Sequence, residues 1–73
     1  MCKYKVQVIR AGNILFSQKI SSSLDNPEII VTLAYKMNNH KAEYYDHITV
    51  YEINDNIPHE IYRELITERP KNV

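Results

Sequence analysis

Histidine and cysteine side chains could hold a zinc ion, and a glycine-rich loop could hold the phosphate of a cofactor. The histidines are His40, His47 and His59, and they stand at none of the short, regular spacings that zinc ligands use. Cys2 is the single cysteine and Gly12 the single glycine, which is too few for a cysteine-based site or a glycine-rich phosphate loop. We therefore expect surface histidines, no metal site and no cofactor.

Carboxylates recur in pairs three or four residues apart, as in Glu43 with Asp46 and Glu60 with Glu64. Acid–base catalysis needs two carboxylates in a cleft that drives their pKa values apart. A solvent-facing helix offers no such cleft, and a domain this small has little room for one. The serines at 21–23 lack a base placed as in known nucleophile motifs. The sequence thus predicts a protein that is not an enzyme.

Length and composition indicate one small globular domain. The chain has 73 residues, of which 44% are hydrophobic and 25% charged, and this balance is too apolar for a disordered segment. The N-terminus lacks the apolar stretch of a signal peptide, and no apolar run approaches the ~20 residues of a membrane helix. We expect a cytoplasmic protein that does not bind membranes.

Hydrophobic periodicity predicts an α+β domain over residues 1–73, with elements in the order β-β-α-β-α. Alternating apolar residues predict the strands, and a 3.6-residue apolar repeat predicts the helices. The expected elements are strands over 3–10, 14–20 and 47–53, helices over 27–38 and 58–68, and a frayed tail over 69–73.

Local residues set the boundaries of the first three elements. Gly12 tolerates the positive φ that a tight hairpin turn requires. Asn26 before Pro27 is typical of a helix cap with proline at the first helical position, although Asp25 with Glu28 forms a competing capping box. We favour Asn26 because a residue that precedes proline avoids the helical region.

The C-terminal third is predicted to end in a second, short helix. Pro58 can open that helix, and Ile57, Ile61 and Leu65 recur every four residues along it. The segment 42–46 before the third strand could extend the first helix or form a loop, and the sequence leaves this open.

We expect the three strands to form an antiparallel sheet in the order 2-1-3, with the first helix packed on one face. Alternation assigns to the covered face Val6, Val8, Ile14, Phe16, Ile48 and Val50. The first helix should meet this face through Ile30, Leu33, Ala34 and Met37. The open face is the first predicted partner-binding surface, with Lys3, Lys5, His47, Thr49 and Tyr51.

Charge is divided between the two ends of the sequence. Residues 1–24 carry four cations and no carboxylate, whereas residues 25–73 carry five cations and nine carboxylates. A divided charge can steer one face of a protein toward a charged partner, even though the formal net charge is zero. The second predicted partner-binding surface is acidic and comprises Glu43, Asp46, Glu52, Asp55, Glu60, Glu64 and Glu68.

The chain has six tyrosines and no tryptophan. Tyrosine combines a large contact area with a polar tip and is enriched at interfaces. Val31 and Tyr35 lie four residues apart and off the main apolar stripe of the first helix. We expect this pair, or the third strand, to support a homodimer.

The abundance of Ile, Asn, Lys and Tyr is similar to that of proteins from AT-rich genomes. The small size, the two-signed surface and the lack of a cofactor site resemble short phage proteins that block host enzymes, including anti-CRISPR and antitoxin-like inhibitors. This resemblance covers composition and architecture, and it implies a stoichiometric inhibitor or adaptor in the cytoplasm of a bacterial host.

The leading hypothesis is therefore a non-enzymatic protein-binding module that blocks an intracellular enzyme or complex, which could be one that handles nucleic acid. One alternative is a nucleic-acid-binding protein that uses the basic N-terminal hairpin, with Tyr4 and Tyr51 stacking on bases if they face outward. Its phosphate contacts would come from Lys3, Lys5, Arg10 and Lys19. A second alternative is a self-assembling structural subunit.

Overall fold

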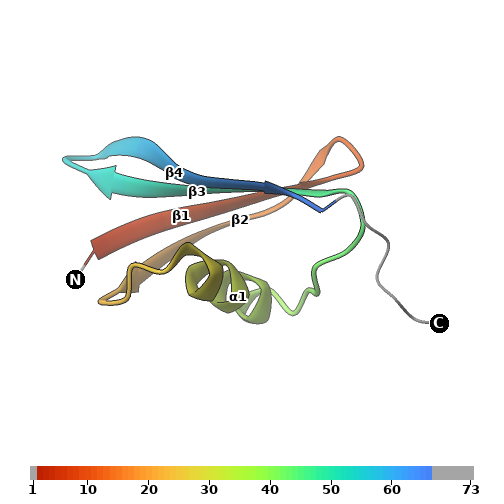
Figure 1. The fold of residues 1–73 in the computed structure, drawn as a ribbon, viewed down its shortest axis with the longest axis horizontal. Helices are drawn as coiled ribbons and strands as arrows, with labels where there is room; N and C mark the ends of the chain where they lie inside the picture. The colour runs from red at the N-terminus through yellow and green to blue at the C-terminus, as the bar shows by residue number, and fades with distance from the viewer. Residues whose placement is uncertain (1, 67–73) are drawn as a thin grey trace.

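The computed structural model describes residues 2–66, which form a four-stranded antiparallel sheet with one helix on one face (Figure 1). The elements, in chain order, are β1 (Cys2–Arg10), β2 (Asn13–Ser22), α1 (Pro27–Met37), β3 (Asp46–Asn54) and β4 (Ile57–Leu65). The strands lie in the order β2-β1-β3-β4. Two hairpins, β1–β2 and β3–β4, are thus joined side by side through β1 and β3, while α1 connects them along the chain.

The prediction of a three-stranded sheet with two helices is wrong. The first three strands do lie in the expected relative order, but the segment predicted as a helix over 58–68 forms β4 up to Leu65. Residues 67–73, and with them the predicted tail over 69–73, lie outside the described residues.

The reason for this error lies in the spacing of Ile57, Ile61 and Leu65. A four-residue spacing fits the two-residue repeat of a strand as well as the 3.6-residue repeat of a helix, so it does not separate the two. The preceding turn decides the outcome, because Asp55 and Asn56 have φ angles of 52° and 64°. Two consecutive residues with positive φ are typical of a tight hairpin turn, which leads directly into an antiparallel strand.

The predicted start of the first helix is confirmed. The Asn26 side-chain oxygen accepts a hydrogen bond from the Glu28 backbone N–H at 2.9 Å, and Pro27 occupies the first turn, where its missing N–H is not needed. The helix ends at Met37, and residues 42–46 do not extend it.

The core lies between α1 and one face of the sheet (Figure 1). The Phe16 and Tyr35 rings pack nearly perpendicular to each other with centroids 5.2 Å apart, which is a favourable aromatic geometry. Buried hydrophobic residues come from the first three strands and the helix, and they are Tyr4, Val6, Val8, Phe16, Ile20, Ile30, Ala34, Tyr35, Ile48 and Val50.

One residue predicted for the covered face, Ile14, is instead 62% exposed. Val8 pairs with Phe16, but the next residue, Ile9, pairs with Ile14, so Leu15 is an extra residue on β2. This β-bulge reverses which face each side chain occupies, because alternation is interrupted by one position. Ile14 consequently lies beside Ile9 on the open face.

The helix is also rotated about its axis relative to the prediction. Ile30 and Ala34 face the sheet as expected, but Leu33 is 37% and Met37 57% exposed. Tyr35, which was predicted to lie off the main stripe, is buried, and its hydroxyl group bonds to Asp46. Burial of this large ring with a satisfied polar tip turns α1 toward β3 and leaves the Leu33 side in solvent.

Candidate functional site

The uncovered face of the sheet brings together all five residues predicted for it. Residues directly opposite each other in antiparallel strands share a face. Lys5 pairs with both Tyr51 and Lys19, and Lys3 belongs to the same alternating set. The other predicted members continue that set as Gln7 opposite Thr49 and Ile9 opposite His47.

This face carries an excess of positive charge. Among residues 2–66, its cations are Lys3, Lys5 and Lys19 on the first hairpin and Arg63 on β4, and its carboxylate is Glu60. Four cations against one carboxylate leave three positive charges. The Arg63 Nη2 atom lies 2.6 Å from a Glu60 carboxylate oxygen, whereas no carboxylate within residues 2–66 pairs with any of the three lysines. We name these three side chains, with Tyr51 between them and β4, the lysine face.

The carboxylates predicted as one acidic surface do not share a surface. Asp46 begins β3 and Glu43 precedes it, while Glu52 lies near the far end of β3, roughly 20 Å away along the strand, and Asp55 follows that end. Asp46 is fully buried, so its carboxylate is not available to a partner.

The remaining predicted carboxylates are divided between the two faces of β4. Glu60 lies on the open face opposite Tyr51. Glu64 lies on the helix side opposite Ile48, where it accepts a hydrogen bond from the Tyr62 hydroxyl group at 2.9 Å. Glu68 lies outside the described residues.

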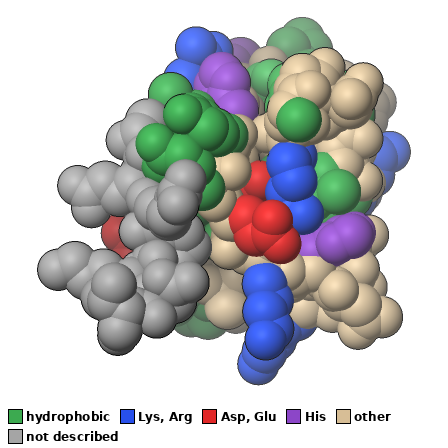
Figure 2. Space-filling view, turned by 90° about the vertical axis from the view of Figure 1, so that its right-hand side faces the viewer, with side chains coloured by type: hydrophobic (Ala, Val, Ile, Leu, Met, Phe, Trp, Pro, Cys, Tyr) green, Lys and Arg blue, Asp and Glu red, His purple; other side chains and the backbone are tan. Residues whose placement is uncertain are grey.

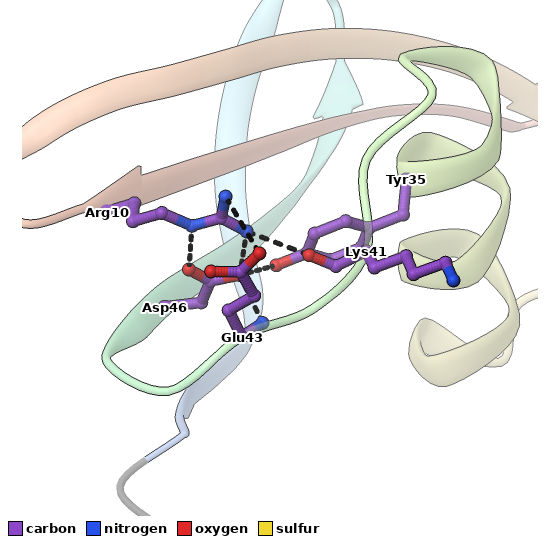
Figure 3. Close-up of polar contacts among 5 residues, drawn as sticks. All are labelled: Arg10, Tyr35, Lys41, Glu43 and Asp46. Carbon is purple, nitrogen blue, oxygen red and sulfur yellow. Dashed lines mark hydrogen bonds and ion pairs between the residues drawn. The ribbon is translucent and has the colours of Figure 1, made fainter. Parts of the chain in front are cut away.

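Asp46 is instead the centre of a buried ion pair with Arg10 (Figure 3). The guanidinium group donates from Nε to Oδ1 at 2.7 Å and from Nη2 to Oδ2 at 3.0 Å, which is a bidentate contact. The Tyr35 hydroxyl group donates to Oδ2 at 2.6 Å, and the Glu43 backbone N–H donates to the same atom at 3.0 Å. Arg10 also donates to the Lys41 carbonyl oxygen at 2.8 Å. The cluster therefore ties β1, α1 and β3 to the 38–45 connector.

This cluster was not predicted from the sequence, although the alternation of residues along β1 and β3 contained the information. Arg10 is in phase with Val6 and Val8, and Asp46 is in phase with Ile48 and Val50, so both belong to the covered face. The antiparallel register of β1 with β3 then pairs Arg10 with Asp46 directly. Counting charges along the chain concealed that the two groups neutralise each other.

The basic N-terminal part and the acidic C-terminal part of the sequence therefore do not form two separate charged ends in the structure. Figure 2 views the end of the molecule that holds the ion pair, and acidic side chains there lie against basic ones. The charge asymmetry that remains is the lysine face.

The environment of the cluster sets its ionisation. Burial on its own would raise the pKa of the Asp46 carboxyl group, but hydrogen bonds from Arg10, Tyr35 and the Glu43 backbone outweigh it and hold that pKa below its usual value. Burial and the hydrogen bond to Asp46 both raise the pKa of the Tyr35 hydroxyl group. Asp46 is thus a carboxylate, and Tyr35 a neutral donor, across the ordinary pH range.

We expect acid to remove the contribution of Asp46 to stability. A carboxyl group with a lowered pKa in the folded state stabilises the fold above its unfolded pKa of about 3.9, and loses this contribution as pH falls through the folded value. Urea unfolding followed by circular dichroism should show the free energy of unfolding falling below about pH 4 in the wild type. In Asp46→Asn the slope of the free energy of unfolding against pH should be smaller, by the equivalent of up to one bound proton. Equal slopes in the two proteins would contradict the assignment.

A groove of about 550 Å³ lies between α1, the 40–42 segment and β4. Helix α1 leaves the inner side of β4 partly uncovered, and the predicted self-association residues Val31 and Tyr35 line the groove. Val31 is half-buried there, and Tyr35 is only 6% exposed because its hydroxyl group is bonded to Asp46. Its lining combines apolar side chains with polar and charged ones; the former are Val31, Ile48, Tyr62 and Ile66, and the latter are Glu28, Thr32, Lys36, His40, Lys41 and Glu64.

The three histidines occupy unrelated places. His40 stacks on Phe16 with ring centroids 5.8 Å apart, His47 lies on the open face, and His59 lies in β4. Within residues 2–66 no three His, Cys, Asp or Glu side chains are grouped as metal ligands. In the same part of the chain, no helix has the length and apolar character to cross a membrane.

Comparison of the chain with protein-family models, with curated proteins and with solved structures finds no match.

Proposed function

We propose that the protein is a non-enzymatic protein-binding module whose lysine face docks on an acidic surface of an intracellular partner. The observation that carries this proposal is the set of three lysines on one uncovered sheet face, with no carboxylate paired to them in the described part of the chain. Unpaired charge of one sign on a flat face favours encounter with a surface of opposite sign.

The composition of the face supports a protein as the partner. Tyr51 stands directly opposite Lys5 and is half-buried, and Ile9 and Ile53 are half-buried on the same face. Protein interfaces combine such aromatic and aliphatic anchors with a polar surround. A strand-built face is also rigid, which limits the ordering cost of binding.

Nucleic acid fits the same face less well. Arg10, which the alternative hypothesis used as a phosphate contact, is committed to Asp46. Tyr4 is 1% exposed, so Tyr51 alone could stack on a base. Three lysines would give a salt dependence with a slope of about −3 at most, which is weak for a nucleic-acid-binding protein.

The resemblance to short phage inhibitors supports a stoichiometric role in which the bound module occludes a cytoplasmic enzyme or complex of a bacterial host. Such a role requires a binding surface and no catalytic residues. A partner that itself handles nucleic acid would have to present its acidic face, and not its basic groove, to the lysine face.

The test is charge reversal on the lysine face. Affinity capture from bacterial lysate should compare the wild type with the triple variant Lys3→Glu, Lys5→Glu and Lys19→Glu, and mass spectrometry should identify the captured proteins. Expected is a partner that the wild type retains at low salt and the triple variant loses, with an affinity for the purified partner reduced roughly a hundredfold or more. Nuclease treatment should leave this capture unchanged.

The control reverses a lysine that lies away from the face and outside α1, Lys41→Glu in the connector, and should retain the partner. Retention by the triple variant overturns the proposal. Capture that nuclease abolishes, together with a mobility shift of single-stranded oligonucleotide by the wild type, would favour nucleic acid instead.

A further inference from the structure

The outer edge of β2 is long and poorly protected. β2 has ten residues, and within residues 2–66 no strand pairs with its outer side. Natural edge strands are usually protected from further pairing by proline, bulges or several charges. The other edge strand, β4, has Pro58, a bulge at Ile61 and four charged or histidine side chains, whereas β2 has one bulge near its start and one charge, Lys19.

An apolar stripe on α1 lies beside this edge. Ile29, Leu33 and Met37 follow one another at four-residue spacing and are 41%, 37% and 57% exposed. Val31 and Tyr35 line the groove on the β4 side of α1, so the stripe occupies the side of the helix toward β2. Ile29 and Leu33 border a hollow of about 300 Å³ that has Glu28 toward one end and Lys36 toward the other.

We propose that a second copy of this chain covers both features, with β2 paired antiparallel to β2 and α1 packed antiparallel to α1 about a two-fold axis. An axis perpendicular to the sheet makes the two edge strands antiparallel and keeps both helices on the same side of one eight-stranded sheet. The same two-fold rotation then buries both the unpaired backbone groups of β2 and the apolar stripe of α1.

The spacing of the elements agrees with this arrangement. Neighbouring strands lie about 4.8 Å apart, and α1 packs on β2 and β1. A helix centred above those two strands stands about one strand spacing from the axis, which places the two helix axes on the order of 10 Å apart. Packed helices lie at about 8–10 Å from each other.

The charges on the helix favour a second copy over an unrelated partner. Glu28 is in the first turn of α1 and Lys36 is in the last turn. When two such helices pack antiparallel, Glu28 of each copy approaches Lys36 of the other, so the stripe is complementary to itself. The pair predicted from the sequence, Val31 and Tyr35, takes no part. The lysine faces of the two copies would form one continuous surface.

Sedimentation equilibrium of the full chain over a range of concentrations tests the inference. The wild type should reach twice the monomer mass, and Leu33→Arg should raise the dimer dissociation constant roughly a hundredfold, because each dimer loses two buried leucines. Ile61→Arg on β4 alters a residue of similar exposure, 41%, and should leave the constant unchanged. Circular dichroism verifies that both variants fold.

Exchanging the charges of Glu28 and Lys36 distinguishes ion pairing between the two copies from an effect on the fold of each copy. Either Glu28→Lys or Lys36→Glu alone places two like charges at positions 28 and 36 of facing helices. Each single variant should therefore weaken the dimer about tenfold. The double variant restores opposite charges and should recover dimerisation, even though it has the least favourable charges for the helix dipole. A wild type that is monomeric at every concentration overturns the inference, as does a dimer that Ile61→Arg disrupts, or a double variant weaker than both single variants.

Discussion

Asp46→Asn should lower the free energy of unfolding by about 3 kcal/mol, which is the lower part of the range for breaking a buried ion pair. Asparagine has nearly the same shape as aspartate, so the change removes charge with little loss of packing. It leaves the Arg10 guanidinium group, whose side chain is 23% exposed, without its carboxylate. It also weakens the acceptor of the Tyr35 hydroxyl group and of the Glu43 backbone N–H. A domain of this size has little stability to spare, so a large unfolded fraction is expected at 25 °C.

Urea unfolding monitored by circular dichroism measures this loss. The matched control is Glu43→Gln, because the Glu43 carboxylate is 3.8 Å from Arg10 and its side chain is 62% exposed. An exposed pair of this kind contributes about 0–1 kcal/mol, so the control should unfold close to the wild type. If Asp46→Asn and Glu43→Gln lose equal stability, the buried cluster is not what holds the connector to the sheet.

Ile30→Ala should lower the free energy of unfolding by about 3 kcal/mol, whereas Leu33→Ala should change it by less than about 1 kcal/mol in the monomer. Ile30 is fully buried against the sheet, and its truncation leaves a cavity that the surrounding strands cannot close. Leu33 is 37% exposed on the same helix, so its truncation removes less buried area than that of Ile30 and leaves a gap that is open to solvent.

The comparison should be made by urea unfolding at protein concentrations low enough to keep both variants monomeric, because Leu33 contributes to the proposed dimer. The two residues are three apart on one helix and have the same number of side-chain carbon atoms, which makes each the control for the other. A Leu33→Ala loss equal to that of Ile30→Ala would mean that α1 packs with the face predicted from the sequence.

Local patterns predicted the elements that local interactions determine. Alternation over 3–10 and 47–53 agrees with β1 and β3 to within one residue at each end. The Asn26–Pro27 pair placed the helix start correctly, because the cap hydrogen bond forms within three residues. Ala11 and Gly12 both have positive φ, as a tight turn between the first two strands requires.

The features that sequence reasoning missed depend on where the chain returns to itself. The face of Ile14 depends on the bulge at Leu15, which appears only in the register of β1 with β2. The rotation of α1 follows from the bond of Tyr35 to Asp46, which lies outside the helix. β4 was predicted as a helix because its apolar spacing satisfies both repeats, and the positive φ angles at Asp55 and Asn56, which select a hairpin, are visible only in the structure.

The lysine face was the part of the candidate site that the sequence predicted best. Once β1 and β3 are neighbours, alternation alone puts Lys3 and Lys5 on the same side as Tyr51. The acidic surface failed for the opposite reason, because closeness along the chain does not keep Asp46 and Glu52 on one surface when a strand separates them.

The order of the strands also has a consequence for how the chain folds. Each hairpin closes a short turn and can form from neighbouring residues, but β1 meets β3 only after a long loop has closed, and Arg10 and Asp46 stand 36 positions apart. Long-range closure has the larger entropic cost, so the docking of two preformed hairpins is expected to limit the folding rate. The ion pair forms at the seam between them, and its loss should therefore slow their docking as well as speed their separation.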